Sequence, residues 1–318
     1  PDASAEDVGR RVCVPFGSGE KIGVILEVPA ASDLPPEKLK PVRAILRDAP
    51  PFPPDWLALA DFCSHYYQHP FGEVVALALP PALRRRDTLP RLPDREAFRI
   101  TEAGRRALPQ LAQRSIAARL LAALELNGAM SRRELRTVSA SATKQLPDLL
   151  GKGWLIADLE APNRKTASGP ELLDEQRQAV DSMAQAFGGF APFLLHGVTG
   201  SGKTEVYLRL IEQALERGGQ ALLLVPEIAL TPQLEARVSN RFPGALLVSL
   251  HSSLADGARA AGFLQALNGE ADIVLGTRLS VFTPLPRLAL IVVDEEHDPS
   301  FKQQEGMRYS ARDVAVWR

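Results

Sequence analysis

The sequence has few cysteines, no long apolar run and no low-complexity tract. Cys13 and Cys63 are its only cysteines, and they do not form a Cys-x-x-Cys pair. Two thiols cannot supply a zinc site of four thiolates, so we expect two buried, reduced side chains. No stretch approaches the roughly 18 consecutive apolar residues of a membrane span, and the opening PDASAEDVGRR is too polar for a signal peptide. These absences predict a soluble, cytoplasmic protein without a membrane partner.

The net charge of −1 hides an uneven distribution of charged residues. Residues 1–170 hold 24 Lys and Arg against 20 Asp and Glu, a balance of +4, and residues 171–318 hold 13 against 18, a balance of −5. A mildly basic front half is compatible with contact to nucleic acid and equally with a solvated face. The length of 318 residues predicts two or three domains.

The first segment, residues 1–83, has the pattern of a β-rich domain. The stretch KIGVILEV alternates as a strand does, and eight prolines between Pro29 and Pro54 predict loops and turns after it. A helix is expected from Asp55, as its cap, to a stop at Pro70. Residues 84–98 are a charged, proline-punctuated linker, whose three adjacent arginines either touch phosphate or are simply solvated.

Residues 99–165 predict a small helical unit. A helix ends at Asn127-Gly128, a second opens at Ser131 with a capping-box pattern, and a third is followed by a strand, WLIADLE. Pro147 falls in the third helix, which must begin at Leu146 or have different bounds. Three helices and a strand outline a winged helix, a domain that binds DNA or serves as a protein-contact module.

Residues 166–318 alternate between apolar runs and helical patterns. The expected strands are FLLHG, QALLLVP, ALLVSLH, ADIVLGT and LALIVVDEEH. Buried runs that are each followed by a helix imply a parallel sheet covered on both faces. This segment is therefore predicted to be one α/β lobe with a parallel sheet.

A phosphate-binding loop is predicted between the first of these strands and the next helix. Gly197, four residues and then Gly202-Lys203-Thr204 satisfy the pattern in its strand–loop–helix context, and a chance glycine-rich turn is the alternative. Glycines let backbone N–H groups approach phosphate oxygens, while the lysine reaches the β- and γ-phosphates and the threonine hydroxyl ligates Mg²⁺. The expected nucleotide-binding residues are Gly197, Val198, Thr199, Gly200, Ser201, Gly202, Lys203 and Thr204.

A run of acids ends the last strand, in IVVDEEHD. Asp294 is the expected second Mg²⁺ ligand beside Thr204, and Glu295 the group that orients and deprotonates the attacking water. With Lys203, these two acids are the candidate catalytic residues. His297 is either part of this site or an ordinary surface histidine.

Asp-Glu-Glu-His resembles the corresponding motif of superfamily 2 helicases, DNA or RNA motors with RecA-like lobes. Five blocks resemble, in order and spacing, the motifs of the PriA family of replication-restart helicases: GVTGSGKTEVYL, LVPEIALTPQ, LHSSLADGAR, GTRLSVFTPLPRLALIVVDEEHD and FKQQEGMRYSARDVAVWR. SHYYQHPFGEVVALALP resembles that family's N-terminal DNA-binding domain, which recognises a 3′ end. The resemblance implies an ATP- and Mg²⁺-dependent 3′→5′ DNA helicase that acts on stalled forks.

The resemblance also implies roles for further residues. Gln176 lies near adenine, or is a helix-surface glutamine, and His297 couples the nucleotide site to the loop 301–309. The implied DNA contacts are Gly17, Lys40, Thr277, Arg278, Phe301, Lys302, Arg308 and Tyr309. Phe301 and Tyr309 either stack on bases or are core aromatics. Forked and single-stranded DNA, primosome proteins and single-strand-binding protein are the implied partners.

Several parts of the family pattern are not found in the sequence. The strand with Phe-Asp-Tyr that completes the 3′-end pocket is expected before Pro1, and the second lobe, its arginine finger and its zinc-binding cysteines after Arg318. Slow ATP hydrolysis is therefore expected of this chain. The competing readings are a fork-DNA and partner-binding module without appreciable ATPase, and another superfamily 2 translocase.

Overall fold

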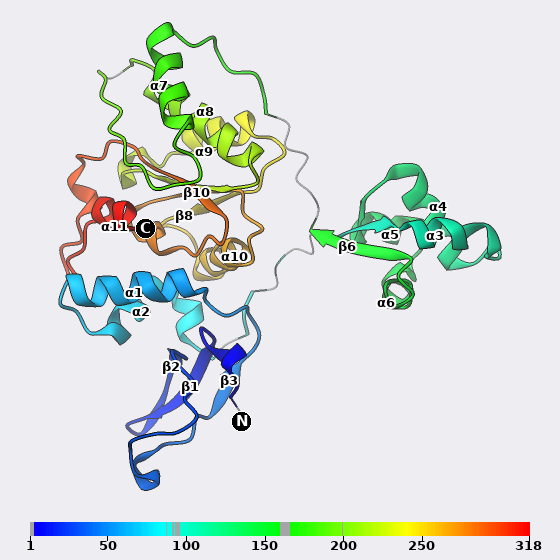
Figure 1. The fold of residues 1–318 in the computed structure, drawn as a ribbon, viewed down its shortest axis with the longest axis horizontal. Coiled ribbons are helices and arrows are strands. Elements are labelled where there is room, and N and C mark those ends of the chain that lie inside the picture. Colours follow the sequence, from blue (N-terminus) through cyan, green and yellow to red (C-terminus); the bar gives the residue numbers. More distant parts are fainter. Residues whose placement is uncertain (1–2, 87, 91, 93–95, 160–165, 199) are drawn as a thin grey trace. The chain divides into compact units, whose positions relative to one another are not determined.

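The computed structural model describes residues 3–86, 88–90, 92, 96–159, 166–198 and 200–318. The chain forms two compact units, one of residues 1–91 and 164–318 and one of residues 92–163 (Figure 1). No helix in the described part of the chain combines the length and the apolarity needed to cross a membrane.

The N-terminal strands form a small antiparallel sheet in the order β2-β1-β3. Its strands are β1 (Arg11–Phe16), β2 (Gly19–Val24) and β3 (Ala44–Leu46), preceded by the 3₁₀ turn η1 (Ala5–Asp7). Phe16 pairs with Gly19, which leaves a two-residue hairpin turn whose first residue, Gly17, has φ +59°. Such tight hairpins require positive φ, which glycine adopts without strain. As predicted, the proline-rich stretch between β2 and β3 has little regular structure, only η2 (Pro36–Lys38).

Two helices and a 3₁₀ turn follow the sheet: α1 (Pro54–Tyr66), α2 (Phe71–Ala78) and η3 (Pro81–Arg84). The helix predicted from Asp55 is confirmed, but its cap was wrong. Pro54 occupies the first helical position, where its missing N–H costs nothing, and Asp55 lies inside the first turn. The buried face of α1 packs on the α/β lobe, because the Trp56 indole N–H donates to the Phe282 carbonyl at 2.7 Å.

The lobe contains a parallel sheet in the order β10-β7-β9-β8. Its strands are β7 (Gln220–Leu224), β8 (Leu247–Leu250), β9 (Ile273–Gly276) and β10 (Leu288–Val293). Its helices are α7 (Asp174–Ala184), α8 (Lys203–Glu216), α9 (Pro232–Arg241), α10 (Asp256–Leu267) and α11 (Ala311–Trp317), with the 3₁₀ turns η5 (Glu227–Ala229), η6 (Arg278–Phe282) and η7 (Pro299–Phe301). Every residue of β7 and β9 is buried, as expected for strands covered on both faces. The predicted parallel sheet is confirmed for these four strands.

The fifth predicted strand, FLLHG, is not formed. Residues 191–198 have no strand structure, and Phe193 and Leu194 are 52% and 75% exposed. Leu195 instead packs against a small apolar cluster of Val180, Val206 and Leu210 on α7 and α8. One packed side chain can anchor a short apolar run without backbone pairing. Because FLLHG forms no strand, β10 is an edge strand of the sheet in the described residues.

The second unit packs helices on an antiparallel sheet in the order β5-β4-β6. Its elements are β4 (Glu96–Ile100), α3 (Glu102–Ala107), η4 (Leu108–Gln110), α4 (Ile116–Asn127), β5 (Met130–Ser131), α5 (Arg132–Val138), α6 (Ala142–Gly151) and β6 (Leu155–Leu159). The three predicted helices and the strand are present, and Gly128 ends α4 with φ +77°. Helix α6 begins at Ala142 rather than at Leu146, because Pro147 lies on its exposed face while Leu146 and Leu149 are buried in the core.

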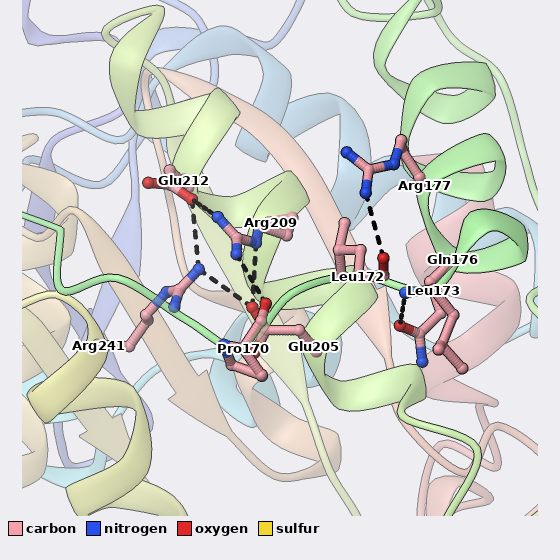
Figure 2. Close-up of polar contacts among 9 residues, drawn as sticks. All are labelled: Pro170, Leu172, Leu173, Gln176, Arg177, Glu205, Arg209, Glu212 and Arg241. Carbon is pink, nitrogen blue, oxygen red and sulfur yellow. Dashed lines mark hydrogen bonds and ion pairs between the residues drawn. The ribbon is translucent and has the colours of Figure 1, made fainter.

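A buried ion-pair cluster holds the segment that leads into the lobe (Figure 2). Arg241 lies 3.1 Å from a Glu205 carboxylate oxygen and 3.4 Å from one of Glu212, and Arg209 pairs with Glu205 at 3.0 Å. Arg209 also donates to the Pro170 carbonyl at 3.1 Å, and the Ala167 N–H donates to the Arg241 carbonyl at 2.8 Å. The cluster therefore binds residues 167–170 to α8 and α9.

We predict that Arg241→Ala lowers the free energy of unfolding by about 1–3 kcal/mol, because it leaves two carboxylates short of a partner at a site with little access to water. Urea unfolding measures the loss. Arg312→Ala is the matched control: Arg312 also pairs with a glutamate, Glu296, but is 53% exposed, so its loss should cost less than about 1 kcal/mol. Equal losses of unfolding free energy in the two variants would contradict the stabilising role of the Arg241 ion pairs.

Candidate nucleotide-binding site and nucleic-acid contacts

The predicted phosphate loop leads directly into α8. Gly200 and Gly202 have φ of +84° and +83°, values that L side chains rarely adopt, and Gly202 is the N-cap of the helix. The first N–H groups of α8 are thus presented at the loop, where an anion is favoured. Thr199 lies outside the described residues.

The Lys203 side chain lies along the inside of this loop. Its ammonium group donates to the Gly197 carbonyl at 2.7 Å and contacts the Val198 carbonyl at 3.3 Å. These oxygens occupy the acceptor role that phosphate oxygens would take. The lysine and the glycines are therefore brought together as the sequence predicts.

Gln176 on α7 contacts the same loop. Its amide N–H donates to the Ser201 carbonyl at 2.8 Å. Its side-chain oxygen accepts from the Leu173 N–H at 3.0 Å (Figure 2). A side chain on Gly202 would collide with this amide. Gln176 is thus next to the predicted nucleotide site rather than on a free helix surface.

Asp294 and Tyr207 form the second half of the site. Asp294 directly follows β10, and one of its carboxylate oxygens accepts from the Tyr207 hydroxyl at 3.3 Å. The same hydroxyl is within hydrogen-bonding reach of Thr204. Burial raises the pKa of Asp294 above its ordinary value of 3.8, and it raises the pKa of Tyr207 to about 12. Sequence reasoning missed Tyr207, whose only signal is its position one turn after Lys203 in α8.

Glu295 and His297 lie at the surface beside Asp294. Glu295 has φ +50°, an unusual value for a residue with a side chain, and its N–H donates to Asp294 at 3.1 Å. Its carboxylate lies 3.9 Å from His297 Nδ1. The exposed position of His297 fits both an ordinary surface histidine and a contact to Glu295.

The residues present fit a magnesium-bound nucleoside triphosphate. No three His, Cys, Asp or Glu side chains gather into a metal cluster in the described part of the chain. Mg²⁺ needs no such cluster, because it keeps water and phosphate oxygens and takes one or two protein ligands. A hydroxyl, Thr204, and a desolvated carboxylate, Asp294, satisfy that need beside the Lys203 ammonium.

Thr277 and Arg278 follow β9 at the same end of the sheet. Thr277 is buried, and the Arg278 guanidinium donates to the Ser300 carbonyl at 2.7 Å and contacts the Lys302 carbonyl at 3.3 Å. Arg278 is thus half-buried and attached to the start of the loop 301–309.

The predicted DNA-binding loop divides into buried aromatics and exposed cations. Phe301 and Tyr309 are 3% and 0% exposed, and the Tyr309 ring packs edge-on against Phe282 with a centroid distance of 5.0 Å. Their burial fits the alternative of core aromatics. Lys302 and Arg308 are exposed and open to phosphate.

The two residues of the implied 3′-end pocket are both exposed. Gly17 forms the β1–β2 turn and has open space around it, and Lys40 follows η2.

A surface cavity lies between α7 and α8, apart from the phosphate loop. Its lining is Glu171, Leu172, Arg177, Val180, Arg209, Glu212, Gln213 and Glu216. Arg177 and Arg209 already donate to the Leu172 and Pro170 carbonyls, so the cavity offers mostly engaged polar groups (Figure 2). The chemistry predicted from the motifs belongs to the loop rather than to this cavity.

Comparison with known proteins matches two family models. One, described as a 3′DNA-binding domain (3′BD), matches residues 1–80, and another, described as a DEAD/DEAH box helicase, matches residues 174–316. The replication restart protein PriA of Haemophilus influenzae is 37% identical over 341 residues, which cover 99% of this chain and 44% of that protein. The protein of the same name from Synechocystis sp. is 32% identical over 100% of this chain and 48% of its own length. The chain spans about half the length of these curated relatives.

We predict that Gly202→Ala destabilises the fold more than Gly200→Ala. Both variants carry the cost of positive φ, about 1 kcal/mol, but only the Gly202 variant also displaces the Gln176 amide. Unfolding in urea, repeated with Gln176→Ala added, measures the difference. If the loss comes from displacement of the Gln176 amide, adding Gln176→Ala to Gly202→Ala lowers the free energy of unfolding little further. Full additivity would contradict this account.

The half-buried carboxylate of Asp294 predicts a dependence of stability on pH. Because the folded pKa of Asp294 is raised above its ordinary 3.8, its ionisation costs stability once the pH exceeds the folded pKa, and this cost disappears as the pH falls below 3.8. Asp294→Asn should therefore raise the melting temperature near neutral pH, with a gap that closes on acidification. A difference in melting temperature between variant and wild type that does not change with pH would show that the Asp294 charge is not its cause.

Proposed function

The chain belongs to the PriA family of replication restart proteins, and on that premise we propose that it provides the DNA-binding region and first motor lobe of an ATP-dependent 3′→5′ DNA helicase. The site of Lys203, Tyr207 and Asp294 beside the glycine loop is the observation that carries the proposal. Residues 166–318 are the proposed first RecA-like lobe. Stalled replication forks are the proposed substrate.

The proposed chemistry follows from the positions of the side chains. With a nucleotide bound, Lys203 would exchange its two carbonyl partners for the β- and γ-phosphates. Thr204 and Asp294 would hold Mg²⁺, and Gln176, which contacts the loop, would lie beside the base. Glu295 orients and deprotonates the attacking water. Bound ATP would supply the phosphoryl group, and Mg²⁺ would supply positive charge for its oxygens. The Tyr207 hydroxyl holds the Asp294 carboxylate in place for that ion.

The proposed DNA contacts lie in both compact units of the chain. Residues 1–83 would bind the 3′ end of a nascent strand through Gly17 and Lys40, and residues 99–165 would act as a winged helix. Lys302 and Arg308 would hold the phosphate backbone, where cations displace counterions. Primosome proteins and single-strand-binding protein are the proposed partners, in the bacterial nucleoid.

The proposal is tested by titrating Mg²⁺ and a fluorescent ATP analogue into the chain. We expect weak but saturable binding that Lys203→Ala abolishes, because the ammonium is the group closest to the loop interior. Glu295→Gln should lower ATP turnover without loss of binding. Binding that is unchanged in Lys203→Ala would contradict the proposal. A chain that binds DNA but no nucleotide would favour the binding-module reading.

The DNA-end contact has its own test. Lys40→Ala should lower the preference for forked DNA with a free 3′-hydroxyl over the same fork with a blocked 3′ end, since the positive charge is lost from an exposed site. Fluorescence anisotropy measures both affinities. Lys38→Ala, which removes a neighbouring charge, is the matched control, and an equal loss of preference in both variants would point to general charge alone.

A further inference from the structure

The loop after the acidic motif is closed at its base by backbone pairing. Lys302 and Ser310 form an antiparallel bridge, and the Gln303 N–H donates to the Tyr309 carbonyl at 2.9 Å. Ser310 is also the N-cap of α11, accepting from the Asp313 N–H at 3.3 Å. The two ends of residues 302–310, called the base loop below, are therefore joined to each other and to the start of α11.

Tyr67, the C-cap of α1, contacts both ends of the base loop. Its hydroxyl accepts from the Ser310 N–H at 3.3 Å, and the Lys302 ammonium lies over its ring, 5.8 Å from the centroid. The ring is half-buried. Tyr67 comes from the N-terminal region, more than 230 residues away in the sequence.

Helix α1 holds Tyr67 in a fixed place on the lobe. The indole of Trp56 donates to Phe282, and the ring of Phe62 stacks on Trp317 of α11 with centroids 4.6 Å apart. Both contacts lie on the lobe's own elements η6 and α11. Helix α1 therefore contacts α11, which follows the base loop, and η6, whose Arg278 contacts Lys302.

Arg278 holds the other side of the base loop. It contacts the Ser300 and Lys302 carbonyls, and the Ser300 N–H in turn donates to Asp298 at 2.8 Å, four residues after Asp294. The base loop is thus contacted by Tyr67 of the N-terminal region on one side and by Arg278, which follows β9, on the other.

We propose that Tyr67 is a positioning residue that ties the base loop to the N-terminal DNA-binding region, so that DNA bound there changes the nucleotide affinity of the lobe. The inference rests on the proposed function. Such coupling is reciprocal: DNA tightens nucleotide binding by the factor by which nucleotide tightens DNA binding. Removal of one neutral hydrogen bond changes an equilibrium by about two- to tenfold, so the hydroxyl alone can carry a measurable share.

The adjacent tyrosines offer a matched pair of variants. Tyr67→Phe removes the hydroxyl that accepts from the Ser310 N–H. Tyr66→Phe removes the hydroxyl of the neighbouring tyrosine, which is 63% exposed and whose ring packs against the rings of Phe62 and Tyr67. The affinity for Mg²⁺ and a fluorescent ATP analogue is measured with and without a forked DNA that has a free 3′ end. Hydrogen exchange at residues 302–310 is followed in the same samples.

For the wild type and Tyr66→Phe, we expect DNA to tighten nucleotide binding by about threefold or more. In Tyr67→Phe, we expect that factor to fall to within about twofold of one, with DNA-free nucleotide affinity unchanged and faster exchange at Ser310. Coupling in Tyr67→Phe that equals the wild type, or no coupling in the wild type, would overturn the inference and leave the proposed function standing. Failure of the wild type to bind nucleotide or DNA at all would overturn both.

Discussion

The common direction of four parallel strands determines where the chemistry of this protein lies. Val293, Leu224 and Gly276 pair across β10, β7 and β9, and Gly276 pairs with Leu250 of β8, so the strands end in line. The residues that follow β10 and β9 are Asp294 and Thr277-Arg278. Parallel strands place their carboxyl ends at one edge of the sheet, which is where ligands of such folds bind. Asp294 and Arg278, which are 16 residues apart in the sequence, therefore lie at the same edge of the sheet because of the strand directions alone.

The phosphate loop depends on the same sheet through α8. Apolar residues of α8 pack with those of β7 and β9 in one core cluster, which fixes the helix and so the loop at its N-terminus. Tyr207 belongs to that cluster, yet its hydroxyl reaches Asp294 at the end of β10. One side chain thus connects the two halves of the candidate nucleotide site while its ring packs in the core. The buried cluster of Arg241, Glu205 and Arg209 adds a second attachment at the outer side of α8 (Figure 2).

The sequence predicted those features that depend on local pattern. Apolar runs such as ALLLV and ALIVV specified parallel strands, and the spacing of Gly197, Gly202 and Lys203 specified the loop, because both signals are contained within a few residues. The strand predicted for FLLHG was wrong, since pairing also depends on what else can hold a short apolar run, here the cluster around Leu195. Tyr67 and Tyr207 could not be found by motif, because their contacts join segments 243 and 87 residues apart. The burial of Phe301 and Tyr309 is likewise a property of tertiary packing.

The central claim is that one edge of the parallel sheet binds a magnesium nucleotide, and hydrogen exchange measured with and without Mg²⁺ and a slowly hydrolysed ATP analogue tests it most directly. The account predicts slower exchange at the amides of residues 197–204, which would meet the phosphates, and at residues 294–296, which follow β10. Slower exchange confined to the α7–α8 cavity around Arg209 and Glu216, or no change at the glycine loop, would contradict it.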